Sequence, residues 1–128
     1  MDKPFFYDIT LRDGNQSLKK PWQLPEKQFI FEKLKELNVQ AVEVGFPASS
    51  HMDFECCKTL ADMADDNLVI SALARTVQKD IDSAVDSIGH AKIPRVHTFL
   101  TLSPFHMKYV LNKEPSYCAN KAIEAVEY

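Results

Sequence analysis

The 128-residue sequence has little of what marks several common functional classes. It holds three glycines, and none of them forms a glycine-rich loop that could cradle a phosphate, which weakens a nucleotide-binding interpretation. Three cysteines, two of them the adjacent Cys56 and Cys57, do not make a disulfide framework. A formal net charge of -3 leaves no basic footprint for nucleic acid. No apolar run approaches the length of a membrane span, and residues 1–4 lack a signal-peptide pattern. These absences predict a cytoplasmic protein that binds neither membrane nor nucleic acid.

The residues that are present predict one α/β domain. Apolar residues make up 45% of the chain and charged residues 26%, as in globular proteins. Short apolar runs alternate with segments of helical periodicity, and this alternation favours a parallel sheet covered by helices. The expected strands are 5–9, 41–45, 68–73 and 96–100; the expected helices are 25–37, 53–64, 80–88 and 115–126, with a loop at 101–113. The pattern alone leaves open a flavodoxin-like sheet and a part of a TIM barrel.

Polar residues stand where the four expected strands end, which is where parallel β/α arrays place their sites. They are Arg12 with Asp13, then Glu43, Arg75 and His97. Each alone has a structural explanation: a turn ion pair for Arg12 and Asp13, a buried Glu43 paired with Arg75, a surface turn position for Arg75, and a core position for His97. Four such positions at one rim favour a site. We also expect Gly14 to adopt a positive φ, so that the chain bends and aims Arg12 and Asp13 at one point.

The stretch Asp8-x-Thr10-Leu11-Arg12-Asp13-Gly14-x-Gln16-Ser17 resembles the first-strand signature of the 2-isopropylmalate, homocitrate and citramalate synthase family. The likeness continues in order through residues 42–47, 53–55, 72–75, 80–82, 95–99 and 106–107. Residues 19–22 depart from it, since the family usually has a small Pro-Gly stretch there. The resemblance implies an α/β fold, a (β/α)8 TIM barrel. Residues 1–128 would form its first four β-α units, the N-terminal half of the catalytic domain.

The resemblance also implies a chemistry, in which acetyl-CoA condenses with a 2-oxo acid. The reaction it favours is 3-methyl-2-oxobutanoate to 2-isopropylmalate, in leucine biosynthesis. Asp13 would be a ligand of a divalent metal (Mn, Mg or Zn), with monovalent potassium as an activator. Arg12 would be the catalytic residue, stabilising the enolate or the substrate oxyanion. Gln16, Glu43 and His97 would join Arg12 in binding the 2-oxo acid, and Glu43 would be a pocket carboxylate and not a metal ligand.

One motif of that family has no counterpart here. The family completes its metal site with a His-x-His pair on a late strand, whereas no two histidines in this chain are two residues apart. We therefore expect an N-terminal fragment that is inactive alone. The alternatives are a citramalate or homocitrate synthase, or a catalytically silent half barrel that acts only by assembly. An apolar inner sheet face, including Val42, Val44 and Ile70, is expected to favour a homodimer.

Overall fold

A computed structural model describes residues 3–128 and confirms the α/β class. Its four parallel strands lie in the order β1-β2-β3-β4, so each connection moves one place along the sheet. The strands are β1 Tyr7–Asp8, β2 Ala41–Gly45, β3 Val69–Arg75 and β4 Ile93–Phe99. The α-helices are α1 Leu24–Glu36, α2 His51–Asp62, α3 Gln78–Ile88, α4 Pro104–His106 and α5 Pro115–Glu127. Tighter or wider helical turns occupy η1 Thr10–Gly14, η2 Pro47–Ser49 and η3 Met107–Leu111. This arrangement is that of the first part of a TIM barrel.

The main core lies between the sheet and the first three helices. Alternate residues of β2 and β3 are fully buried against α1, α2 and α3; they are Val42, Val44, Ile70, Ala72 and Ala74. Phe31, Leu60 and Ile88 meet them from the helices. Val42, Val44 and Ile70 therefore face the helices, and the expectation that they line an apolar inner face is wrong.

The opposite face of the sheet carries polar side chains near its middle. The register pairs Glu43 with Ser71, and Leu73 with His97. Since side chains alternate along a strand, Glu43, Ser71 and His97 share the face that the helices leave open. Tyr7, paired in register with Ala41, lies on the same face.

The start of α2 also differs from the sequence prediction. Ser50 is the N-cap residue and its hydroxyl accepts from the backbone N–H of Asp53 at 3.1 Å, so α2 begins before Asp53. The carboxylate of Asp53 instead accepts from the backbone N–H of Phe46 at 2.8 Å and from Nζ of Lys27 at 2.7 Å. Lys27 is 2% exposed, and its ion pair with the partly buried Asp53 connects α1 to the turn that follows β2.

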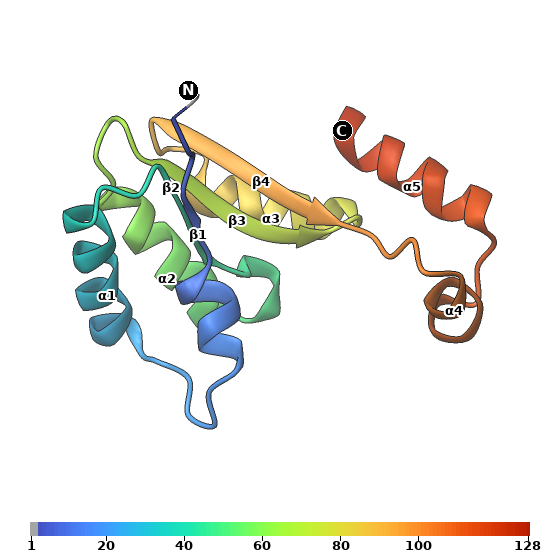
Figure 1. The fold of residues 1–128 in the computed structure, drawn as a ribbon, viewed down its shortest axis with the longest axis horizontal. Helices are drawn as coiled ribbons and strands as arrows, with labels where there is room; N and C mark the ends of the chain where they lie inside the picture. The colour runs from blue at the N-terminus through green and yellow to red at the C-terminus, as the bar shows by residue number, and fades with distance from the viewer. Residues whose placement is uncertain (1–2) are drawn as a thin grey trace.

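Both ends of the described chain depart from the predicted elements. The first strand is only two residues long, and Phe5 and Phe6 before it are exposed. The expected loop 101–113 contains α4 and η3. Figure 1 shows α4 and α5 beyond the carboxyl end of β4. Tyr128, directly after α5, donates its hydroxyl to Asp82 of α3 at 2.9 Å.

Across residues 3–128, none of the helices combines the length and the apolar character that crossing a membrane requires.

Candidate active site

The turn after β1 is built by two local features of its sequence. The carboxylate of Asp8 accepts from the backbone N–H of Thr10 at 2.9 Å and from the Thr10 hydroxyl at 3.1 Å, which closes the turn. Leu11 is fully buried and anchors the turn in the core. The two residues that follow are thereby aimed differently: the side chain of Arg12 is 14% exposed, whereas that of Asp13 is 60% exposed.

Gly14 does not do what the sequence suggested. It ends the helical turn η1, and no glycine in residues 3–128 has a positive φ. Its N–H donates to the carbonyl of Ile9 at 3.3 Å, as do the N–H groups of Arg12 and Asp13. The bend that places Arg12 is therefore made by three bonds to one carbonyl and not by a left-handed glycine.

The centre of the site is the carboxylate of Glu43, which is fully buried in β2. Nε of Arg12 donates to its Oε2 at 2.5 Å. Its Oε1 lies 2.5 Å from Nδ1 of His97 and accepts from the hydroxyl of Tyr7 at 2.9 Å. A buried carboxylate is costly unless it is paired and hydrogen-bonded. Here donors from β1, η1 and β4 converge on it, so the end of the sheet is organised around this one charge.

Tyr7 and Ser71 belong to the same network. The two hydroxyl oxygens lie 3.0 Å apart, and the rings of Tyr7 and His97 meet edge to face with centroids 6.2 Å apart. Burial raises the pKa of Tyr7 to about 12, so the phenol stays neutral and remains a donor at physiological pH.

Of the six predicted site residues, three meet, one lies beside them, and two, Gln16 and Arg75, do not join them. Arg12, Glu43 and His97 form one cluster, and Asp13 borders it through Nη1 of Arg12, which donates to Oδ1 of Asp13 at 2.6 Å. Gln16 is exposed just after η1, and within the described chain no hydrogen bond joins it to the cluster.

Arg75 is also separate, and of its two explanations the pair with Glu43 is wrong. Its Nε donates to Oδ2 of Asp80 at 2.6 Å, and its Nη2 donates to Oδ1 at 3.1 Å. Asp80 lies in the first turn of α3, five residues along the chain, so the guanidinium finds a partner locally. The hydrogen bonds from Arg75 lower the pKa of Asp80.

Tyr7 and Ser71 are the site residues that the sequence interpretation missed. Both lie inside apolar runs, where the pattern predicts strand residues and gives no sign of a further role. The available signal was alternation: Glu43 faces away from Val42 and Val44, so polar residues on that same face of the neighbouring strands were candidates for its partners.

A divalent metal finds one suitable group in this part of the chain. The carboxylate of Asp13 is exposed at the rim, and its Oδ2 has no hydrogen-bond partner among residues 3–128. Such an oxygen suits a hard cation. No group of three or more His, Cys, Asp or Glu residues that could hold a metal is found in the described residues. Asp13 therefore fits as one ligand of a site that needs others.

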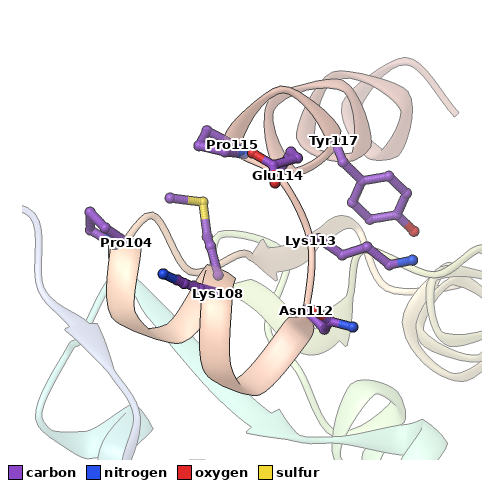
Figure 2. A pocket seen from close by; sticks show the side chains of 8 residues that line it. Pro104, Lys108, Asn112, Lys113, Glu114, Pro115 and Tyr117 are labelled. Carbon is purple, nitrogen blue, oxygen red and sulfur yellow. The ribbon is translucent and has the colours of Figure 1, made fainter.

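A separate hollow of about 610 Å³ lies between α4 and the start of α5. Figure 2 shows the residues that line it, among them Lys108, Lys113 and Tyr117. Nζ of Lys113 lies 4.9 Å from the centre of the Tyr117 ring. None of the predicted site residues lines this hollow, so it is distinct from the Glu43 cluster.

Comparison with known proteins places these features in a family context. A sequence model of the HMGL-like family matches residues 3–128. The chain is 44% identical over 125 residues to 2-isopropylmalate synthase 2 of Leptospira interrogans, covering 98% of this chain and 29% of that protein. It is 43% identical to the 2-isopropylmalate synthase of Pyrococcus abyssi and 42% identical to that of Halalkalibacterium halodurans, in each case over the whole chain. It spans 26% and 25% of those two relatives.

Proposed function

The chain belongs to the HMGL-like family, and from that premise we propose that it forms the N-terminal half of the catalytic barrel of an acetyl-CoA-dependent 2-oxo-acid synthase. The proposed reaction condenses acetyl-CoA with 3-methyl-2-oxobutanoate to give 2-isopropylmalate, in leucine biosynthesis. The names of its relatives support this choice. A cytoplasmic location is part of the proposal, and the free thiols Cys56, Cys57 and Cys118 are in keeping with it.

The observation that carries the proposal is the fixed arrangement of Arg12 beside Glu43. Glu43 holds Nε of Arg12, and Asp13 holds Nη1. Within residues 3–128 the Nη2 group has no hydrogen-bond partner, so the guanidinium is oriented with the two N–H bonds of Nη2 left for a ligand. A donor held in place before the reaction can stabilise the negative charge that develops on an oxygen as the new carbon–carbon bond forms.

The charges of the cluster fit an anionic substrate only with a cation added. With His97 neutral, Arg12 offsets one of the two carboxylates, and one net negative charge remains. A divalent cation on Asp13 would make the group net positive by one charge, which suits a 2-oxo acid carboxylate. When bound, such a metal supplies Lewis-acid polarisation of the keto oxygen.

His97 is the second group that we assign to the 2-oxo acid. Its Nδ1 donates to Glu43 and the side chain is 39% exposed, so Nε2 is the nitrogen available to a ligand. In the neutral ring this nitrogen accepts, so its partner would be the hydroxyl that forms from the keto oxygen during condensation. Glu43 is fully covered and acts on the substrate only through Arg12 and His97. Gln16 is proposed to contribute from the first loop, where its exposed side chain can turn toward a ligand.

A chimera tests the proposal. We would replace the matching 125-residue region of the Leptospira interrogans enzyme with this chain, and then measure CoA release from acetyl-CoA with 3-methyl-2-oxobutanoate and a divalent metal. We expect activity with this acceptor. A clear preference for the 2-oxo acid of a citramalate or homocitrate synthase would select those alternatives instead.

Variants of the chimera separate the roles of the two rim residues. Asp13→Ala should weaken metal binding. Arg12→Ala should leave metal affinity nearly unchanged and depress turnover, and Arg12→Lys should rescue it poorly because an ammonium cannot reproduce the guanidinium fork. Tyr109→Phe, at an exposed tyrosine, is the matched control. A folded, metal-binding chimera that is inert toward every 2-oxo acid would refute the proposal. Normal metal affinity in Asp13→Ala would refute the assignment of Asp13 as a metal ligand.

A further inference from the structure

We propose that Tyr7 is a positioning residue: its hydroxyl, held by Ser71, fixes the carboxylate of Glu43 and thereby sets which nitrogens of Arg12 and His97 face the open side of the sheet. This inference concerns the geometry of the cluster and goes beyond the proposed function. Only its consequence for turnover rests on that function.

The directions of the hydrogen bonds follow from counting hydrogens. The hydroxyl of Tyr7 lies 2.9 Å from Oε1 of Glu43 and 3.0 Å from Oγ of Ser71, but it has a single hydrogen to give. An ionised carboxylate only accepts, so Tyr7 donates to Glu43. The hydroxyl of Ser71 must then donate to Tyr7. The result is a directed chain from Ser71 to Tyr7 to Glu43 that joins β3, β1 and β2.

This series of hydrogen bonds holds the carboxylate of Glu43 in one orientation. Its Oε1 accepts hydrogen bonds from the hydroxyl of Tyr7 and from Nδ1 of His97, and its Oε2 accepts one from Nε of Arg12. Both Glu43 and Ser71 are fully buried, so water cannot replace a missing donor at either end. Without the phenol, Oε1 would keep His97 as its single donor, and the carboxylate could rotate between its two partners.

The orientation of Glu43 in turn fixes its partners. An acceptor-only oxygen at 2.5 Å requires the hydrogen of His97 to be on Nδ1, which leaves Nε2 for a ligand. The edge-to-face contact with Tyr7 holds the same imidazole ring from a second side. On the other carboxylate oxygen, the bond to Nε of Arg12 fixes the guanidinium, and its Nη2 group has no hydrogen-bond partner among residues 3–128.

The test uses NMR spectra of the 128-residue chain and needs no substrate. Long-range ¹H–¹⁵N spectra report which ring nitrogen of His97 carries the hydrogen, and His97→Asn assigns the signal. His51, whose side chain is 89% exposed, supplies the reference for an unconstrained histidine. We expect His97 to differ from His51, with its hydrogen on Nδ1, and the Nε–H of Arg12 to exchange slowly with solvent.

Tyr7→Phe removes only the hydroxyl. We expect the His97 signals to move toward those of His51, and Nε–H exchange at Arg12 to accelerate about tenfold, the equivalent of one hydrogen bond. Ser71→Ala should cause a smaller change in the same direction. Adding Ser71→Ala to Tyr7→Phe should cause none, because Ser71 acts through Tyr7. Tyr109→Phe, outside the cluster, should leave both signals in place.

Two results would overturn the inference. One is a folded Tyr7→Phe chain with unchanged His97 and Arg12 signals. The other is a wild-type His97 that already matches His51. If Tyr7→Phe does not fold, Ser71→Ala decides, since it keeps the aromatic ring, and unchanged signals there refute the chain of bonds. A failure of the synthase assay would alter none of these readouts, so the two proposals fail separately.

Discussion

Removal of the Glu43 carboxylate is the sharpest test of whether this charge organises the end of the sheet. Glu43→Ala leaves the hydroxyl of Tyr7, Nε of Arg12 and Nδ1 of His97 facing an empty space. Glu43→Gln keeps the shape. Its amide oxygen can accept from Arg12 while its amide N–H groups donate to His97 and to Tyr7, so the bonds are rearranged and the charge alone is lost.

The expected magnitudes differ accordingly. Removing one partner of a buried ion pair costs about 3–5 kcal/mol. Arg12 and His97 are partly exposed and can take up water, which puts Glu43→Ala near about 3 kcal/mol, the lower end of that range. Glu43→Gln should cost about 1–2 kcal/mol, because hydrogen bonds to a charged acceptor become neutral ones. For a chain of this size, 1 kcal/mol corresponds to about 4 °C in the midpoint of thermal unfolding. That midpoint should fall by about 12 °C in Glu43→Ala and by about 4–8 °C in Glu43→Gln.

The assay is thermal and urea unfolding of the chain, followed by circular dichroism. The matched control is Glu55→Ala on α2, whose side chain is 52% exposed and lies 3.9 Å from His51. It should change the free energy of unfolding by less than about 0.5 kcal/mol. If Glu43→Ala and Glu55→Ala lose the same small amount, the Glu43 network does not stabilise the fold and the reasoning fails.

Three further predictions concern other parts of the chain. The hydrogen bond from Arg75 lowers the pKa of Asp80. The stability that this carboxylate contributes is therefore present above the ordinary carboxyl pKa of about 4 and is lost as pH falls through the lower pKa of the folded state. The difference in unfolding free energy between wild type and Asp80→Asn should shrink on acidification, and a constant difference would contradict the pairing. Gly14→Ala should leave stability unchanged or raise it by up to about 1 kcal/mol, since the added Cβ would meet Thr10 at 3.5 Å. Gly45→Ala should lower it by about 1–3 kcal/mol, because its Cβ would lie 2.7 Å from Sγ of Cys57; melting curves of the two variants check this contrast. Finally, β4 pairs only with β3 within the described chain and exposes Ile93 and Phe99, so sedimentation velocity should show dimers, with Phe99→Lys shifting the chain toward monomer; a monomeric wild type would remove the case for association.

The periodicity of apolar residues was enough to predict the order of strands and helices. Strands β2 and β3 and the helices that cover them each bury their own apolar residues. Periodicity failed where a polar group decided the local structure. A glycine after two polar residues predicts a positive φ at Gly14. The chain does not adopt it, because Asp8 and Thr10 close a helical turn at η1 instead. The first strand is expected to begin at Phe5 but begins at Tyr7, because Phe5 and Phe6 are apolar yet exposed.

The membership of the site was predicted better than its pairing. Arg12, Glu43 and His97 were expected at one rim, and they meet there. Which arginine binds Glu43 depends on which other carboxylates compete for each arginine, and the order of residues in the sequence does not show this. Asp80 reaches Arg75 from the next helix, which leaves Glu43 to Arg12 from the first turn. Tyr7 and Ser71 became identifiable only when strand register placed them opposite the same carboxylate.

The isolated chain should hold this arrangement and still lack activity. Every contact that frames Glu43 comes from residues 7–97, so the frame forms without any further ligand. The proposed metal, by contrast, finds only the exposed carboxylate of Asp13 here, and one monodentate group competes poorly with water. Titration with Mn²⁺ should therefore give weak binding that Asp13→Ala abolishes, and acetyl-CoA with 3-methyl-2-oxobutanoate should release no CoA. The His97 and Arg12 signals should be unchanged by the metal, because their bonds to Glu43 are already made. Turnover by the purified chain would show that the metal site and the substrate pocket are complete within these residues, and would refute the assignment of Asp13 as a partial site.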